Sequence, residues 1–311
     1  MALPNAAGSG RPPGDRVVTM LRTIALITSL LLMPGIAGAV KYPLTIKDCR
    51  GKAVTISREP KRIISLAPNN TEILFALGLD SRIVGVTRYC DYPTAAKKKP
   101  KVGGRTISAE KVISLKPDLV LAHGMLNDDA IRAIESHGLK VVAIDPKTIG
   151  QVVKDILLVG KIANREKEAA CIAARISSAK ALVKRKTACM KTKPRVLIAV
   201  QASPLWVAGP RTFVHEMIAL AGGANLASDA KPGFNQFSVE TAVWRNPDVI
   251  IGTAKGDKQV FTKGLWKDTK AARAGRVYEA DPDLLVRPGP RLADGILTIA
   301  GLVHPDVFGK S

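Results

Sequence analysis

The sequence predicts an α/β protein with two parallel-sheet lobes, joined by one long backbone helix and with a ligand crevice between them. Three observations support this prediction. Residues 108–122 read SAEKVISLKPDLVLA and residues 238–252 read SVETAVWRNPDVIIG, so one helix-then-strand unit occurs twice. Around both units, short apolar strands alternate with helices, as in a parallel sheet covered on both faces. Between the two halves, residues 149–190 have a helical pattern alone.

The first half opens with a predicted hairpin at residues 42–56, where apolar and polar residues alternate around a tight turn. An α/β alternation follows. We expect a helix over 69–79, capped by Asn or Thr and ended by Gly78, and we interpret Glu72 near its start as a capping residue. The other elements expected here are strands at 62–68, 82–88, 118–124 and 139–145, the helix of the repeated unit, and a helix at 127–138.

The helical segment has a weak point near 164–166 and ends at Lys193-Pro194. Its second part, 166–190, would span about 37 Å at 1.5 Å per residue, enough to cross from one lobe to the other. The alternation then restarts, with strands at 195–201, 248–252 and 276–281 and helices at 212–223, 238–245 and 291–302. We therefore divide the chain into a first lobe (40–147, with the hairpin), a connecting segment (148–194) and a second lobe (195–311).

Residues 1–39 are typical of a secretory signal. Arg22 precedes the apolar stretch TIALITSLLLMPGIAGA, which ends in Ala37-Gly38-Ala39. A membrane anchor is the alternative, but Pro34 and Gly35 interrupt a run that is shorter than the roughly 20 residues a spanning helix needs. Residues 1–19 add nothing that a signal requires, so Met20 is an alternative start. No lipobox cysteine follows the signal, so we expect a protein free in the periplasm.

The net charge is +21, and loss of residues 1–39 would leave about +19. The basic residues are spread along the chain, and the two dense runs, at 97–101 and 184–186, are interpreted as solvated faces. We therefore expect no nucleic-acid partner, and attraction of an anionic ligand or an acidic envelope surface instead.

The four cysteines would meet an oxidising compartment if the signal is real. Cys171 and Cys189 lie about 27 Å apart on a continuous helix, too far for a disulfide. A Cys49–Cys90 bridge within the first lobe stays open. No Cys-x-x-Cys spacing supports a metal site.

Ligands of parallel sheets bind beyond the carboxyl ends of the strands, so the crevice loops should carry the site. The loops of interest are 89–93, 123–125, 201–206 and 281–291.

Five segments, in order, carry a resemblance to a known family: RIISLAPNNTEILFALGL, RIVGVTRYCDYP, ISLKPDLVLA, RNPDVIIG and RPGPRLADGI. The chain resembles, over most of residues 42–305, the exported substrate-binding proteins of type II ABC importers for cobalamin, iron-siderophores and haem. The resemblance implies two α/β lobes bridged by a long helix, limited lobe closure, and no permanent cofactor. It also implies an ABC importer permease dimer as partner and a small metal chelate as ligand, with the protein itself a monomer.

The family resemblance assigns a role to one glutamate per lobe, which docks onto arginines of the permease. Here these positions are Glu110 and Glu240, each two residues after a Ser at a helix start. Capping of the helix is the alternative reading of Ser-x-Glu.

For the ligand, the crevice loops offer Tyr89, His123, Trp206, Phe234 and Arg287. Aromatic walls suit a flat chelate, and Tyr89, Trp206 and Phe234 fall near aromatic positions of cobalamin receptors. The resemblance thus favours a corrinoid, with a ferric siderophore or haem as the alternative. His123 could ligate haem iron or be an ordinary polar residue. Arg287, together with Arg291, could contact an anionic ligand group or brace the last loop.

An enzyme is a rival class. His215-Glu216 begins a zinc-protease-like string, but Ala219 stands where the second His ligand must lie. The remaining histidines show no metal-ligand spacing, and no nucleophile elbow, phosphate loop or dinucleotide fingerprint occurs. We expect no catalysis. A basic interaction protein of the envelope is the other rival.

Overall fold

The computed structural model describes residues 40–309, and Met1; the predicted signal lies outside the described residues. The described part opens with the expected hairpin, in which strand β1 (Leu44–Lys47) pairs antiparallel with β2 (Ala53–Ile56). Gly51, at φ +79°, allows the tight turn between them.

The first lobe is built on a four-stranded sheet of order β4-β3-β5-β6, in which every neighbouring pair is parallel. The predicted α/β alternation is confirmed. The strands are β3 (Ile63–Ser65), β4 (Ile83–Val86), β5 (Leu119–His123) and β6 (Val141–Ile144), and the helices are α2 (Pro68–Ala76), α3 (Ala109–Ser114) and α4 (Asp128–Ser136), with 3-10 turns at Asp80–Arg82 and Thr94–Lys98.

Helix α2 begins differently from the prediction. Its N-cap is Ala67, whose side chain cannot accept a hydrogen bond, and Pro68 occupies the first turn. Proline fits there because its fixed φ suits a helix start and its missing N–H is not needed. The predicted Asn or Thr cap is therefore wrong. The predicted capping role of Glu72 is also wrong, because this residue is only 3% exposed and its carboxylate accepts a hydrogen bond from the second lobe. The predicted end is correct, because Gly78 has φ +69°.

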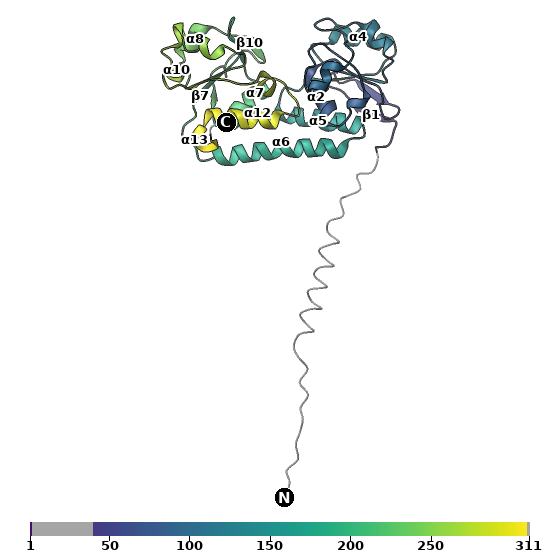
Figure 1. Cartoon of the computed structure of the whole chain (residues 1–311), viewed down its shortest axis with the longest axis horizontal. Helices are drawn as coiled ribbons and strands as arrows, with labels where there is room; N and C mark the ends of the chain where they lie inside the picture. The colour runs from purple at the N-terminus through teal and green to yellow at the C-terminus, as the bar shows by residue number, and fades with distance from the viewer. Residues whose placement is uncertain (2–39, 310–311) are drawn as a thin grey trace. The chain divides into compact units, whose positions relative to one another are not determined.

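Two packed helices connect the lobes: α5 (Ile149–Ile162) and α6 (Glu166–Thr187). Thr148 and Gln151 form a capping box at the start of α5, and the break falls at Asn164, with φ +55°. The 22 residues of α6 extend about 33 Å. This helix runs beneath both lobes, as predicted (Figure 1).

The second lobe has a sheet of order β10-β8-β7-β11-β12, with β9 also paired to β7. Its strands are β7 (Arg195–Gln201), β8 (Trp206–Ala208), β9 (Ala224–Asn225), β10 (Phe234–Gln236), β11 (Val249–Gly252) and β12 (Val277–Glu279). The core strands β7, β11 and β12 are parallel as predicted. The expectation of a purely parallel sheet is wrong at one edge, where β8 and β10 run antiparallel.

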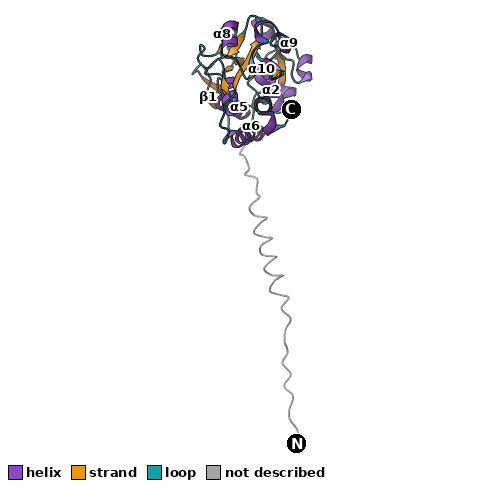
Figure 2. Ribbon diagram, turned by 90° about the vertical axis from the view of Figure 1, so that its left-hand side faces the viewer, coloured by secondary structure: helices purple, strands orange, loops and turns teal. Residues whose placement is uncertain are grey.

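The predicted helices of the second lobe are α7 (Phe213–Leu220), α8 (Val239–Trp244) and α12 (Leu292–Val303). Short helices absent from the prediction are α9 (Asp257–Val260), α10 (Lys270–Arg273), α11 (Pro282–Leu285), α13 (Pro305–Phe308) and a 3-10 turn at Gly264–Trp266. Figure 2 shows the strands enclosed by helices. Within residues 40–309, no helix is both long and apolar enough to cross a membrane.

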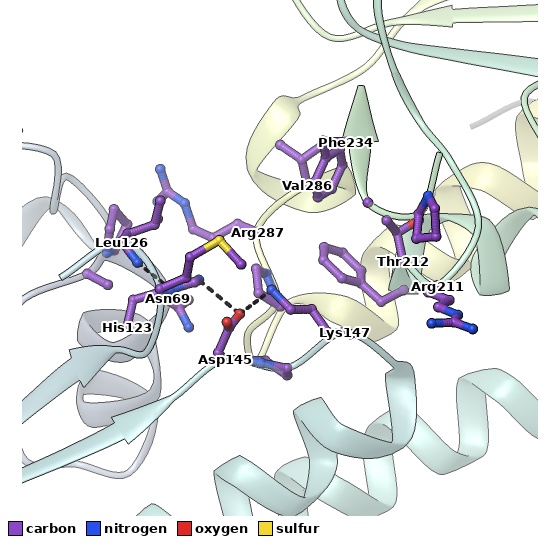
Figure 3. Close-up of a pocket in the computed structure, with 18 of the residues that line it drawn as sticks. Asn69, His123, Leu126, Asp145, Lys147, Arg211, Thr212, Phe234, Val286 and Arg287 are labelled. Atoms are coloured by element: carbon purple, nitrogen blue, oxygen red, sulfur yellow. Dashed lines mark hydrogen bonds and ion pairs between the residues drawn. The ribbon is translucent and has the colours of Figure 1, made fainter. Parts of the chain in front are cut away.

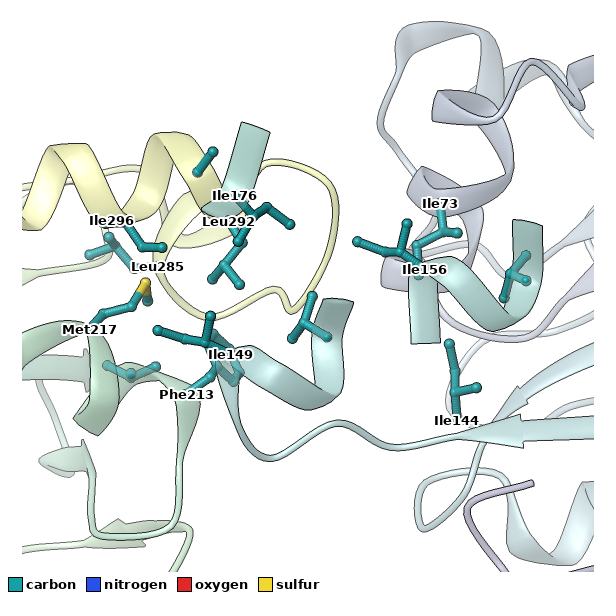
Figure 4. Packing of buried hydrophobic residues seen from close by; sticks show 14 of the residues in the cluster. Ile73, Ile144, Ile149, Ile156, Ile176, Phe213, Met217, Leu285, Leu292 and Ile296 are labelled. Carbon is teal, nitrogen blue, oxygen red and sulfur yellow. The ribbon is translucent and has the colours of Figure 1, made fainter. Parts of the chain in front are cut away.

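The largest hydrophobic cluster is shared between the lobes. It includes Ile73 and Ile144 of the first lobe, Ile176 of α6, and Met217 and Ile296 of the second lobe (Figure 4). Two smaller clusters lie within single lobes, one around Leu197 and Phe261 and one around Ile64 and Val120. The shared cluster fixes the two lobes against the connecting helices, and thereby sets the width of the crevice above them.

All four cysteines are free thiols. Cys90 is buried, and its Sγ lies 3.2 Å from Oγ1 of Thr87, whereas Cys49 lies in the exposed hairpin turn. The Cys49–Cys90 bridge considered from the sequence is therefore not formed.

Candidate functional site

A cavity of about 770 Å³ lies between the two lobes, at the carboxyl ends of their strands (Figure 3). Its position is where parallel sheets bind ligands. The first lobe contributes residues 67–69, His123, Met125, Leu126 and 145–147, and the second lobe contributes 211–213, 232–234, Asp283 and 286–288. The wall is mainly apolar, with charged side chains at a few places, which is the usual composition of a small-molecule site.

His123 and Asp145 meet on the first-lobe wall because neighbouring strands end there. His123 is the last residue of β5 and pairs in register with Ile144, the last residue of β6. Its Nε2 lies 3.3 Å from Oδ1 of Asp145, and Nζ of Lys147 donates to the same oxygen at 2.6 Å. Burial lowers the pKa of His123 by more than the Asp145 carboxylate raises it, so the imidazole is neutral near pH 7.

Beneath this wall lies a set of acidic groups. Burial, reinforced by the Asp145 carboxylate, raises the pKa of Asp155 on α5 to about 7. Burial together with Asp48 and Asp145 raises the pKa of the Cys49 thiol to about 11, so it is neither a nucleophile nor a ready metal ligand at neutral pH. Within residues 40–309, no cluster of three or more His, Cys, Asp or Glu is placed to hold a metal ion.

An ion cluster at the crevice links the two lobes. Glu72 of α2 accepts from Nη1 of Arg287 at 2.8 Å, and from Nε and Nη2 of Arg291 at 2.9 and 2.7 Å. Arg287 also reaches Asp91 at 3.0 Å and Asp283 at 2.7 Å. Burial alone would lower the pKa of both guanidinium groups, but Glu72 and the neighbouring carboxylates raise it, so they stay charged.

A second glutamate, at the equivalent place of the second lobe, links that lobe to the connecting segment. Glu216 of α7 corresponds to Glu72 in the duplicated pattern, and its Oε2 accepts from the backbone N–H of Ile149 at 2.7 Å. It thereby satisfies a free donor at the start of α5. Glu72 thus links the two lobes, whereas Glu216 links the second lobe to the connecting helix α5.

The structure brings together three of the five ligand residues expected from the sequence. His123, Phe234 and Arg287 line the cavity, although the guanidinium of Arg287 is already bonded to three carboxylates. Tyr89 and Trp206 lie outside its lining and are 54% and 38% exposed. Trp206 on β8 pairs with Gln236, two residues from Phe234, so it stands near the rim of the second-lobe wall.

Sequence reasoning missed several lining residues. Asp145 and Lys147 directly follow a predicted strand, so applying the strand-end rule to 139–145 would have found them. Asn69 lies in the first turn of α2 and Arg211 precedes Thr212, the N-cap of α7; the position of these helix starts at the crevice was not evident from the sequence.

Glu110 and Glu240 occupy equivalent places on α3 and α8. Ser108 caps α3 by accepting from the N–H of Lys111 at 3.2 Å, and Ser238 caps α8 by accepting from Thr241 at 2.9 Å. Both glutamates are exposed, and neither carboxylate has an ion-pair partner in the described part of the chain. Hydrogen bonds from its own backbone N–H and from Ser238 lower the pKa of Glu240, so it is ionised at neutral pH.

Comparisons with known proteins agree with this architecture. The family described as "Periplasmic binding protein" matches residues 63–284. A Bacillus subtilis protein named an uncharacterized ABC transporter substrate-binding lipoprotein, YvrC, is 37% identical over 275 residues, covering 86% of this chain and 87% of that protein. A cobalamin-binding protein of Halobacterium salinarum is 27% identical, covering 86% of this chain and 75% of that protein. The solved periplasmic haem-binding protein RhuT of Roseiflexus sp. RS-1, in its apo form, is 28% identical, with a TM-score of 0.70 over 80% of this chain and 99% of that chain.

Proposed function

Since this chain belongs to the periplasmic binding protein family, we propose that it binds a bulky metal chelate between its lobes and delivers it to an importer permease. It is a substrate-binding component of an ABC transporter of the cobalamin, haem and siderophore group, and not an enzyme. The observation that carries the proposal is the cavity of about 770 Å³, lined from both lobes and mainly apolar.

A corrinoid is the first candidate ligand. The cobalamin-binding relative supports it, as do the aromatic side chains of Phe213 and Phe234 on the cavity wall. Rigid rings gain contact area against a flat chelate at a small cost in side-chain entropy.

Haem is the second candidate, and His123 favours it. The imidazole is neutral, lines the cavity, and has a carboxylate partner in Asp145. When Nε2–H of His123 points to Asp145, Nδ1 carries the lone pair that could bind iron. The N–H of Leu126 makes only a long contact of 3.4 Å with this Nδ1. A neutral imidazole oriented by a carboxylate is a common arrangement for an iron ligand.

Titration of the purified mature protein tests the ligand class. Cyanocobalamin, haemin and a panel of ferric siderophores would be added while tryptophan fluorescence is followed, because Trp206 stands near the rim of the cavity. Saturable quenching by one chelate, with micromolar or tighter affinity, is expected. A protein that responds to none of them would contradict the proposal.

We further propose that Glu110 and Glu240 are the permease contacts. Both carboxylates lie on exposed helix starts and have no ion-pair partner among the described residues, so each can receive a forked guanidinium from a partner. The second-lobe contact has an added anchor, because Trp244 lies four residues after Glu240 on α8 and is 83% exposed. Residues four apart share a helix face, and exposed tryptophans are frequent binding anchors.

The double substitution Glu110→Ala with Glu240→Ala is expected to leave chelate affinity unchanged and to abolish uptake through the cognate permease. A matched control is Glu166→Ala with Glu168→Ala, which removes two acidic residues from the first turn of α6, a helix that lies across the molecule from α8 (Figure 1). Wild-type uptake by the Glu110/Glu240 variant would refute the docking assignment.

We also propose that the protein is released into the periplasm after cleavage at Ala39. The first cysteine of the chain is Cys49, in the hairpin turn, so no thiol stands at that cleavage point for lipid attachment. The intact mass of the protein from a periplasmic extract should correspond to a chain beginning at Val40; a lipid-modified mass would argue against release.

A further inference from the structure

The second lobe exposes two large apolar side chains on neighbouring elements. Trp244 ends α8 and is 83% exposed, and Leu265, in the 3-10 turn that follows α9, is 60% exposed. The turn packs against α8, and both side chains lie outside the hydrophobic clusters described above. Exposed apolar groups that do not support the core are typical of an interaction surface. We call Trp244 and Leu265 the apolar patch.

The apolar patch continues the surface that carries Glu240. Glu240 and Trp244 are four residues apart on α8, so they share one face of this helix. Two exposed lysines, Lys263 and Lys267, flank Leu265 in the chain. An apolar centre with a polar rim is the usual anatomy of a protein–protein interface. Since α8 lies across the molecule from α6, the patch faces the same partner as Glu240 (Figure 1).

The equivalent helix of the first lobe has no such anchor. The duplicated units align Ser114 of α3 with Trp244 of α8, and Lys111 with Thr241. The hydroxyl of Ser114 donates to the backbone carbonyl of Lys111 at 3.0 Å. The face of α3 that carries Glu110 therefore presents a small polar side chain and a charge where α8 presents tryptophan.

The basic run at residues 97–101 is exposed, as expected for a solvated face, and lies beside the start of α3. Ser108, the N-cap of α3, donates its backbone N–H to the carbonyl of Val102 at 2.9 Å. The Nζ of Lys101 donates to the carbonyl of Ala96 at 3.0 Å, which ties the preceding 3-10 turn to the same place. Five exposed cations without an ion-pair partner within residues 40–309 form this basic patch: Lys97, Lys98, Lys101, Arg105 and Lys111.

We infer that the two lobes dock onto the permease through different chemistry. The basic patch meets an acidic surface beside the arginine that receives Glu110, and the apolar patch enters an apolar pocket beside the arginine that receives Glu240. This inference rests on the proposed docking role of the two glutamates and specifies the partner surfaces. Exposed charges attract over about 10 Å at 0.1 M salt, so they act on the encounter. A buried tryptophan acts on the lifetime of the complex, because it must be exposed again before the partners separate.

Binding kinetics test the charged contact. The probe is the importer that supports uptake with the wild-type protein, reconstituted in nanodiscs of phosphatidylcholine. Lys97→Glu with Arg105→Glu should lower the association rate constant tenfold or more at low salt and leave dissociation unchanged. At about 1 M salt, where the Debye length is about 3 Å, the difference should vanish. The control Lys184→Glu with Arg185→Glu makes the same charge change on α6 and should alter neither rate constant.

The apolar contact is tested on the same nanodiscs. Trp244→Ser with Leu265→Ser should raise the dissociation rate constant tenfold or more at both salt concentrations, with association unchanged. Folding should be preserved, because neither side chain belongs to a hydrophobic cluster. The matched control is Leu157→Ser, which removes a 40% exposed leucine from α5 and should alter neither rate constant.

A wild-type association rate for the charge variant, or a wild-type dissociation rate for the apolar variant, would overturn the inference. The docking role of Glu110 and Glu240 would still stand if their double variant loses uptake. Empty nanodiscs that contain phosphatidylglycerol separate a lipid contact from a permease contact. Salt-sensitive binding of the wild-type protein to these discs, abolished in the charge variant, would assign the basic patch to lipid headgroups and would also overturn the inference.

Discussion

At the scale of single residues, Arg211 combines an unfavourable backbone with a place on the cavity wall. Its φ is +59°, in the left-handed region, where a residue with a Cβ is strained by about 1 kcal/mol or more. Backbone strain of this kind is characteristic of functional positions. A glycine at position 211 would relieve the strain, but it would remove the arginine side chain from the cavity wall.

The substitution Arg211→Gly should therefore raise the free energy of unfolding by about 0.5–1 kcal/mol, because glycine adopts positive φ without strain. It should also weaken binding of the chelate to which the wild-type protein responds, because Arg211 lines the cavity. Urea unfolding and fluorescence titration give the two readouts. Lys116→Gly is a matched control: this lysine has φ +46° and lies outside the cavity lining, so the change should stabilise the protein without altering affinity. Unchanged affinity of Arg211→Gly would remove Arg211 from the binding surface.

Single residues also show where sequence reasoning was limited. Asp145 and Lys147 could have been found from a strand end. Glu72 could not, because a glutamate near a helix start has an adequate local explanation in capping, whereas its actual partners lie 215 and 219 residues away. A tertiary ion pair leaves no local pattern, so only the fold revealed it.

At the scale of elements, α2 is attached to the second lobe through Glu72. The carboxylate is 2% exposed and its two arginine partners are 14–15% exposed, so the cluster is shielded from water. Removing one member of a buried ion cluster leaves uncompensated charge, which costs more than the loss of a surface pair.

Glu72→Ala should therefore lower the free energy of unfolding by about 3 kcal/mol at pH 7, measured by urea denaturation. Asp268→Ala, which removes a surface ion pair whose partners are 66% and 68% exposed, should cost less than about 1 kcal/mol. A loss of similar size in the two variants would mean that the Glu72 cluster does not hold the lobes together.

The long, regularly patterned elements were predictable from the sequence, including α6, the parallel strands and the Ser caps of α3 and α8. The short antiparallel strands β8 and β10 were not. Each has three residues, too few for alternation to be recognised, and their pairing depends on a contact between segments far apart in the chain.

At the scale of the whole molecule, the duplicated lobes share their largest hydrophobic cluster, beside one smaller cluster in each lobe. The sequence pattern revealed the duplication. Only the structure shows that α5 and α6 pack into a hydrophobic cluster that contains residues of both lobes. Ile144 at the end of β6 belongs to the same buried cluster as Met217 and Ile296 of the second lobe. Because the largest cluster is continuous between the lobes, we expect them to unfold in a single cooperative transition.

Ile144→Ala tests this cooperativity. The side chain is fully buried, so its truncation should cost about 2–5 kcal/mol. All three tryptophans, Trp206, Trp244 and Trp266, lie in the second lobe, so their fluorescence reports that lobe alone. If the lobes unfold together, the urea midpoint seen by tryptophan fluorescence should fall by the same amount as the midpoint seen by far-UV circular dichroism. A fluorescence midpoint that stays at the wild-type value would mean that the lobes unfold independently. The shared cluster would then not fix the width of the crevice.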